Sequence, residues 1–324
     1  MKALLVFSGG LDSLLAAQVI RAQDIDVLGL FFETPFFSSA KAKQSAAEIH
    51  LPLKIVDLTE PHLRIVRKPK YGYGGNMNPC IDCHALMLRR AGELLEKEGA
   101  SFVISGEVLG QRPMSQNFKA LSIVAKESSF NGLILRPLCA KHLPVTTPEE
   151  KGWVKREGLL GLSGRSRKPQ MELAGKLNIR HYPSPAGGCL LTDPVFSRRL
   201  RDLFSSRPEC TLREIELLKI GRHFRLGPAT KLVVGRNKKE NDIITSLSCE
   251  NDLVLQVENI PGPTVLITGE ASPEEEALAL SITASYSDAK EDQAVEITIV
   301  GRGMERFSQG KRCDKGRFSP MMIQ

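Results

Sequence analysis

The sequence predicts an α/β fold, a doubly wound parallel sheet, followed by a smaller α+β domain. Short apolar runs alternate with amphipathic stretches in the first part of the chain, a pattern typical of parallel strands joined by helical crossovers. Helical patterns follow, and beyond residue 207 the apolar runs become β-rich and are divided by turn residues. The length of 324 residues suits two domains. We therefore expect domains at residues 1–206 and 207–310, with a loose basic tail at 311–324.

Each element follows from its own pattern. Apolar runs predict strands at residues 2–7, 26–32, 53–58, 102–106 and 132–138. Amphipathic periods predict helices from about Asp12 and at residues 39–50, 84–100, 116–129, 148–158, 168–178 and 196–206. The basic, Gly-rich segment before residue 84 predicts a loop. In the second domain we expect one helix within residues 272–290 and strands at 231–236, 252–258, 264–269 and 294–300.

The composition is that of a globular protein, with 42% apolar and 25% charged residues. No run is long enough to span a bilayer, and the first residues lack the apolar core of a secretory signal. We expect a cytoplasmic protein without a membrane partner. The net charge is +7, and the basic residues gather in patches, which suits RNA and, equally, solvated surfaces.

The segment SGGLDS, residues 8–13, has the features of a phosphate site. It follows the first strand and opens a helix, whose N-terminus attracts anions. Gly9 and Gly10 let backbone N–H groups turn towards a ligand, and Ser8 and Ser13 offer hydroxyl donors. The alternative is an ordinary Ser/Gly helix cap.

This segment resembles the pyrophosphate loop of ATP pyrophosphatases, which cleave ATP between its α and β phosphates. The resemblance implies a Rossmann-like adenine nucleotide alpha hydrolase fold. It also implies that Asp12 holds Mg²⁺ on the pyrophosphate and that Ser8, Gly9, Gly10 and Ser13 cradle it. The backbone of Leu30 and Phe31, at the end of the second strand, would hold adenine.

A second segment, ISGEVLGQRPMSQ at residues 104–116, follows the fourth strand. It resembles the corresponding segment of tRNA 4-thiouridine synthetases. Gly106 allows close approach of a nucleotide, and Glu107 and Gln111 supply polar groups for its ribose or base.

Three cysteines stand in motifs, Cys80 and Cys83 in NPCIDCH and Cys189 in GGCLLTD. Three thiolates are few for structural zinc unless His84 completes the site, and they suit an iron–sulfur cluster with one open iron. A position near a helix N-terminus favours the thiolate of Cys83. Both motifs resemble those of tRNA thiouridylases. Some members bind a [4Fe-4S] cluster through three cysteines, and others use a persulfide on a cysteine pair, here Cys83 and Cys189.

Two regions are candidates for RNA binding. Arg165, Arg167 and Lys168 form a basic loop before Cys189. The second domain resembles the RNA-binding module of NFACT ribosome quality-control proteins, most clearly in VGRNKKEND and IPGP. This resemblance places Arg236 and Lys238 on the nucleic-acid face. Arg222 lies on the same basic, strand-rich stretch and is a further candidate for RNA binding.

Together these features predict an ATP-dependent tRNA sulfurtransferase that forms AMP and pyrophosphate, with ATP, Mg²⁺ and a [4Fe-4S] cluster as cofactors. The product expected is 4-thiouridine, and the alternative is 2-thiouridine. Asp82 is a candidate acid or base. The partners would be tRNA and a sulfur donor, inorganic sulfide or a cysteine desulfurase, and a homodimer is compatible with the sequence. A different class is an RNA-binding protein with structural zinc.

Overall fold

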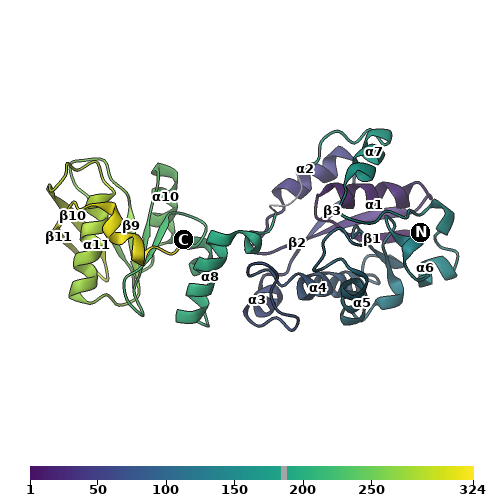
Figure 1. Cartoon of the computed structure of the whole chain (residues 1–324), viewed down its shortest axis with the longest axis horizontal. Coiled ribbons are helices and arrows are strands. Elements are labelled where there is room, and N and C mark those ends of the chain that lie inside the picture. Colours follow the sequence, from purple (N-terminus) through teal and green to yellow (C-terminus); the bar gives the residue numbers. More distant parts are fainter. Residues whose placement is uncertain (184–187) are drawn as a thin grey trace. The chain divides into compact units, whose positions relative to one another are not determined.

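The computed structural model describes residues 1–183 and 188–324, so Gly187 of the GGCLLTD motif lies outside the described residues. The chain forms two compact units, Met1–Thr192 and Asp193–Gln324 (Figure 1). No helix in the described ranges is both long and apolar enough to cross a membrane.

The first unit is built on a five-stranded sheet of order β3-β2-β1-β4-β5, in which every pair is parallel. Its strands are β1 (Lys2–Val6), β2 (Asp26–Glu33), β3 (Leu53–Asp57), β4 (Phe102–Ser105) and β5 (Ile134–Leu135). The chain moves outwards from β1 to β3 and then returns to β4 on the other side of β1. In such sheets ligands bind at the carboxyl ends of the strands, where the order reverses. The predicted fold class is confirmed.

Helices cover both faces of this sheet (Figure 1). One face carries α1 (Leu11–Arg21), α2 (Ala40–Glu48) and α7 (Lys168–Lys176), and the other carries α3 (Thr59–Arg67), α4 (Cys80–Glu93) and α5 (Phe118–Glu127). Successive residues of β1 point to opposite faces. Leu5 therefore joins the core beneath α1 and α2, while Leu4 joins the core beneath α4 and α5.

Three predictions for this unit were wrong. The segment after β3 forms α3 rather than a loop, because Pro61 lies in the first turn, where proline is tolerated. The next helix begins at Cys80 and not at residue 84. The expected helix at 148–158 is reduced to the single turn α6 (Thr147–Glu150), which ends before Gly152 with its φ of +67°.

The second unit contains a six-stranded antiparallel sheet of order β11-β10-β8-β9-β7-β6. Its strands are β6 (Arg222–Arg225), β7 (Lys231–Val234), β8 (Leu253–Val257), β9 (Val265–Thr268), β10 (Ala294–Gly301) and β11 (Met304–Lys311). Its helices are α8 (Pro194–Ser206), α9 (Leu212–Leu217), α10 (Lys238–Leu247) and α11 (Pro273–Ser285). Of these, α9 and α10 were not expected from the sequence.

The division between the units falls before α8 rather than at the predicted residue 206. Asp202 on α8 accepts hydrogen bonds from Arg225 on β6 at 3.0 and 2.6 Å, which ties this helix to the second unit. The prediction of a loose basic tail was wrong. Most of the stretch after β11 forms a 3₁₀ helix, Lys315–Met321, and Phe318 is fully buried in the core of the unit.

Candidate active site

The predicted pyrophosphate loop lies between β1 and α1, at the point where the strand order reverses. Gly9 has a φ of +76°, and a Cβ atom there would lie 2.8 Å from Cα of Ala42. The hydroxyl of Ser13 donates to the carbonyl of Gly10 at 2.8 Å, and the backbone N–H of Gly10 donates to Ser8 Oγ at 3.3 Å. These bonds hold the predicted anion loop in shape, with Gly10 as the cap of α1.

The segment after β4 packs directly against this loop. Gln111 Nε2 donates to Asp12 Oδ2 at 2.9 Å. Asp12 Oδ1 and Gln111 Oε1 are buried, and neither has a hydrogen-bond partner among the described residues. A carboxylate oxygen and an amide oxygen are hard donors of the type that Mg²⁺ prefers. The two side chains therefore fit the predicted magnesium position.

Gly106 is required for this contact. A Cβ atom at residue 106 would lie 2.9 Å from the backbone nitrogen of Ser13 and 3.0 Å from the carbonyl carbon of Asp12. Because these are backbone atoms, Gly106→Ala must displace the pyrophosphate loop. We expect the Kd for ATP to rise on the order of 10-fold to 100-fold, as for 1–3 kcal/mol of overpacking. Calorimetry with ATP measures this change.

Gly175→Ala on α7 is the matched control, because no atom lies within 4 Å of its added Cβ. An unchanged Kd in Gly106→Ala would contradict the packing argument.

Glu107 is the centre of a buried network that the sequence did not reveal. Its Oε1 lies 2.7 Å from Nδ1 of His84, and its Oε2 accepts from Nε of Arg136 at 2.8 Å. Burial alone would raise the pKa of Glu107, but the charge of Arg136 and the bond to His84 lower it to about 2. Glu107, which follows β4, thus connects His84 on α4 to Arg136 after β5. Nδ1 of His84 faces this carboxylate, so only its Nε2 could serve as a fourth zinc ligand.

This network predicts a dependence of stability on pH. The folded-state pKa of Glu107 is depressed from 4.5 to about 2. Its contribution is therefore complete above pH 4.5 and is lost as the pH falls towards 2. Glu107→Gln should lower the free energy of unfolding at pH 7 by roughly 3–5 kcal/mol, because Arg136 is left buried without its partner.

Urea unfolding at pH 7 and pH 3 measures both effects, with the exposed Glu93→Gln as control. If the wild type and Glu107→Gln lost stability equally between these pH values, the role of Glu107 would be refuted.

The three motif cysteines lie close enough for their charges to interact. Cys80 and Cys83 form the first turn of α4, and Cys189 precedes a 3₁₀ turn, Leu190–Thr192. Burial and the neighbouring charges of Cys189 and Cys80 raise the pKa of Cys83. Burial, followed by the charge of Cys80, raises the pKa of Cys189 to about 11, although Leu191 N–H and Arg112 oppose this shift. The expected thiolate at Cys83 is therefore not favoured in the metal-free chain.

His62 is a neighbour of the cysteines that sequence reasoning missed. It is fully buried on α3, and its Nε2 lies 3.2 Å from Sγ of Cys83. Its ring packs against Phe36 and Phe37. Burial lowers the pKa of His62 to about 4, so the ring is neutral at pH 7. Nothing in a single sequence indicates that a histidine in an amphipathic segment will lie beside a distant cysteine.

Asp82 supports the loop that precedes the cysteines. Its two carboxylate oxygens accept from the backbone N–H groups of Lys70 and Tyr71 at 3.0 and 3.1 Å. This geometry gives Asp82 a structural role, and its predicted role as acid or base stays a prediction. In Asp82→Ala we expect faster hydrogen exchange at these two amides and a loss of activity of up to about 30-fold, since two bonds worth about 1 kcal/mol each are removed.

Asp82→Asn, which retains one acceptor oxygen, should be intermediate in both measurements. Unchanged amide exchange together with a complete loss of activity would instead support the acid or base role of Asp82.

The predicted basic loop lies beside the candidate nucleotide site. The backbone N–H of Gly164 donates to the carbonyl of Leu109 at 2.8 Å, next to the Gln111 segment. Arg165 and Lys168 are exposed, and Arg167 is half-buried. The structure thus brings this loop to the 104–116 segment.

At the predicted adenine position, one of the two backbone carbonyls already accepts a hydrogen bond within the protein. Leu30 lies inside β2, which continues to Glu33, and its carbonyl accepts from the N–H of Phe7 at 2.9 Å. Phe31, one residue further, is also buried within this strand. The strand end predicted at these residues was therefore placed too early.

In the second unit the predicted RNA-binding residues gather near one hairpin. Arg222 on β6 pairs with Val234, two residues before Arg236, and Lys238 begins α10. The guanidinium of Arg222 lies 4.9 Å from the ring centroid of Tyr286. Arg236 is paired with Glu240 at 2.5 Å. Lys238 is exposed.

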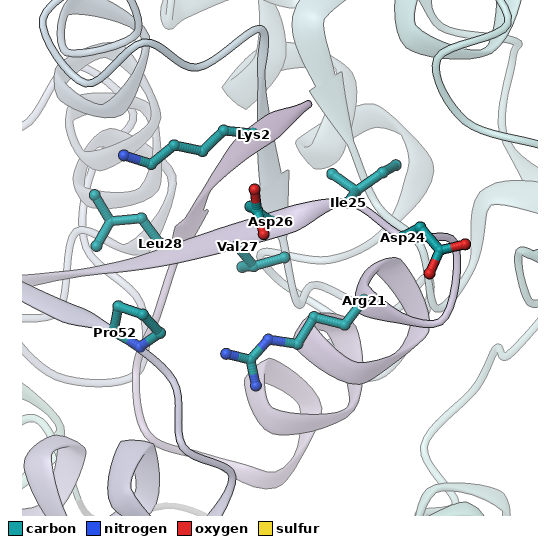
Figure 2. Close-up of a pocket in the computed structure, with 8 residues that line it drawn as sticks. All are labelled: Lys2, Arg21, Asp24, Ile25, Asp26, Val27, Leu28 and Pro52. Carbon is teal, nitrogen blue, oxygen red and sulfur yellow. The ribbon is translucent and has the colours of Figure 1, made fainter.

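A hollow lies at the amino ends of β1 and β2, at the opposite end of the strands from the candidate site (Figure 2). Its cations are used within the protein. Arg21 donates to the carbonyls of Ile49 and His50 at 2.7 and 2.9 Å, and Lys2 donates to the carbonyl of Glu98 at 2.9 Å. We therefore assign no ligand to this hollow.

The first unit thus belongs, by its sheet, to the class of doubly wound α/β domains, and an antiparallel α+β domain follows it. Residues 1–142 match the family described as thiamine biosynthesis protein (ThiI), and residues 221–315 match the NFACT protein RNA binding domain. The chain therefore combines a ThiI-like domain of the pyrophosphate-loop type with a domain of the NFACT RNA-binding type.

Individual proteins match the first part of the chain. A protein of Thermoanaerobacter sp. (strain X514) named "Probable tRNA sulfurtransferase" is 28% identical over 148 residues, 42% of this chain and 36% of that protein. "tRNA-specific 2-thiouridylase MnmA" of Syntrophomonas wolfei is 34% identical over 115 residues, 33% of each chain. The chain thus spans about a third of the length of these relatives.

Among solved structures, a 4-thiouridine synthetase bound to RNA and ATP aligns with a TM-score of 0.36 and 19% identity, over 66% of this chain and 52% of that one.

Proposed function

We propose that the protein is an ATP-dependent tRNA sulfurtransferase that adenylates a uridine and replaces its oxygen with sulfur. The observation that carries this proposal is the segment 104–116, which contacts the loop at residues 8–13 and brings a positive charge near Cys189. Gln111 binds Asp12 in the pyrophosphate loop, and the positive charge of Arg112 acts on Cys189. A nucleotide and a sulfur source would therefore meet at one segment. The names of the relatives above agree with this activity.

The chemistry needs two displacements. In the first, the uridine carbonyl oxygen attacks the α-phosphorus of ATP, the bond to the β-phosphate breaks, and pyrophosphate leaves. In the second, a sulfur nucleophile attacks the activated carbon, the carbon–oxygen bond breaks, and AMP leaves with the original oxygen. Ser8, Gly9, Gly10 and Ser13 would hold the departing pyrophosphate. Magnesium bound by Asp12 would supply positive charge for it.

The sulfur source is proposed to be a [4Fe-4S] cluster held by Cys80, Cys83 and Cys189. No group of three or more His, Cys, Asp or Glu side chains in the described ranges is arranged to hold a single metal ion. Cluster thiolates bind different iron atoms, so they need not converge on one point. The three cysteines repel one another as anions, a cost that bound iron would offset. Such a cluster would supply an iron atom to carry sulfide.

Two finer alternatives remain within this proposal. The segment 104–116 favours 4-thiouridine, whereas the paired cysteine motifs favour 2-thiouridine. A persulfide on Cys83 could also deliver sulfur. In that case Cys189 would form a disulfide with Cys83 as the product leaves, and a thiol reductant would restore both thiols.

The remaining assignments follow from the same function. The backbone of Phe31 would hold adenine. Arg165, Arg167 and Lys168 would contact tRNA beside the site, and Arg222, Arg236 and Lys238 would contact it in the second unit. Sulfide or a cysteine desulfurase would supply sulfur in the cytoplasm, and a homodimer is compatible with the proposal.

The test is an anaerobic incubation of the full chain with ATP, Mg²⁺, sulfide and unmodified tRNA. Iron and acid-labile sulfide are measured beforehand, and nucleosides are analysed by mass spectrometry afterwards. We expect about four irons per chain, AMP as the nucleotide product, and 4-thiouridine in the tRNA. Zinc without AMP formation would refute the proposal and support an RNA-binding protein with a structural metal.

A further inference from the structure

The loop from Lys68 to Pro79 leads directly into Cys80 and carries two exposed tyrosines. Tyr71 and Tyr73 are 37% and 39% exposed. Exposed aromatic rings close to a reaction site and surrounded by positive charge are typical of surfaces on which nucleobases stack. No activity considered above uses these two rings.

Both rings are held by their hydroxyl groups. The hydroxyl of Tyr71 donates to Glu127 at the end of α5 at 2.8 Å, and that of Tyr73 donates to the carbonyl of Val66 at 2.6 Å. Anchoring the hydroxyl limits the rotation of each ring before any ligand binds. A stacking ligand would therefore lose little additional side-chain entropy from the protein.

The charge around the rings suits a polyanion. Lys68 and Lys70 are exposed on the same loop, and Nζ of Lys70 lies 5.3 Å from the ring centroid of Tyr71. Lys70 also pairs with Glu127 at 2.7 Å while 63% of its side chain stays exposed. Between the rings, Gly72 has a φ of +73° and open space around its Cβ position, so ligand backbone can approach.

Hydrogen bonds connect the loop to the cysteines. Asn78 Nδ2 donates to Cys80 Sγ at 3.2 Å. Asn76 Nδ2 donates to the carbonyl of Thr192 at 2.8 Å, three residues after Cys189. Asp82, between Cys80 and Cys83, fixes the backbone at Tyr71. The position of the rings is therefore coupled to that of the sulfur site.

From these observations we infer that the Tyr71–Tyr73 loop binds the single-stranded nucleotides next to the target uridine, by stacking their bases on the two rings. Sequence-specific RNA recognition generally uses unstacked bases on aromatic side chains, and a uridine must leave its stack before its carbonyl can react. The inference rests on the proposed function, because that function makes RNA the substrate at this site.

The first test is photo-cross-linking of the full chain to a single-stranded, uridine-rich RNA dodecamer that carries 5-bromouridine. Cross-linked peptides are then identified by mass spectrometry. We expect adducts on Tyr71 or Tyr73 in addition to any in the second unit. Adducts confined to the second unit would overturn the inference. This readout does not require sulfur transfer, so it stands even if the proposed function fails.

The second test separates the rings from their hydroxyl anchors. In the Tyr71→Ala/Tyr73→Ala variant we expect kcat/KM for tRNA to fall by about 10-fold or more, mainly through KM, as for the loss of base stacking. The matched Tyr71→Phe/Tyr73→Phe variant keeps the rings and should retain most of the activity and the loop cross-link. Equal losses in both variants would show that only the anchors matter and would overturn the inference.

A wild-type protein that thiolates tRNA but forms no loop cross-link would refute this inference alone. If the alanine variant lost only its response to a cysteine desulfurase, while it thiolated normally with inorganic sulfide, the loop would bind a protein and the inference would be wrong.

Discussion

Cys189→Ala is expected to abolish tRNA thiolation while the chain still binds tRNA and ATP. Cys189 contributes one of three clustered thiols, and the charge of Cys80 and the charge of Arg112 both act on its sulfur. Loss of one member of a unit that acts together removes nearly the whole rate, because the remaining members do not replace it. AMP formation on tRNA should persist, because the pyrophosphate loop is unchanged. Nucleoside analysis and AMP release measure the two steps separately.

Cys249→Ala is the matched control, because this cysteine is exposed in the second unit. It should leave both steps unchanged. The ThiI match covers residues 1–142 and does not include Cys189. The Cys189→Ala variant therefore tests a part of the site that the match does not cover. Retained thiolation in Cys189→Ala would refute the three-cysteine site.

Asp12→Asn is expected to reduce pyrophosphate release on the order of 100-fold to 1,000-fold, because magnesium stabilisation worth several kcal/mol is lost. Asparagine can still bond to Gln111, since its amide offers both a donor and an acceptor. The variant therefore removes the charge while preserving the contact. Pyrophosphate release at saturating ATP measures the effect.

Asp26→Asn controls for the loss of one negative charge. Asp26 begins β2 at the opposite edge of the sheet (Figure 2) and should have no effect on pyrophosphate release. If Asp12→Asn released pyrophosphate at the wild-type rate, Asp12 would not hold the metal. The buried, unpartnered oxygens of Asp12 and Gln111 would then need another explanation.

The sequence alone located those parts of the candidate site that depend on neighbours along the chain. The Ser8–Ser13 loop could be identified because the strand, the glycines and the helix start are consecutive. The strands of the parallel sheet were also found, since each is a short apolar run bounded by polar residues. The parallel order then placed both nucleotide segments at one sheet edge.

Contacts between distant segments could not be predicted in this way. His62 meets Cys83 only because α3 packs beside α4, and Glu107 meets Arg136 only because their strands are neighbours. The start of α4 was missed because Pro79, a residue that often ends regular structure, here caps the helix. The last strand, β11, was not predicted because its exposed face is polar and its pairing partner is β10.

The most direct test of the central claim is the ratio of AMP to thiouridine formed by one preparation of the full chain. Anaerobic protein is incubated with ATP, Mg²⁺, sulfide and unmodified tRNA, and both products are quantified over time. One AMP for each thiouridine, with no ADP, is the result expected if ATP cleavage at the pyrophosphate loop activates the uridine that receives sulfur at the cysteines. AMP formed at the same rate without tRNA, and no thiouridine, would contradict it.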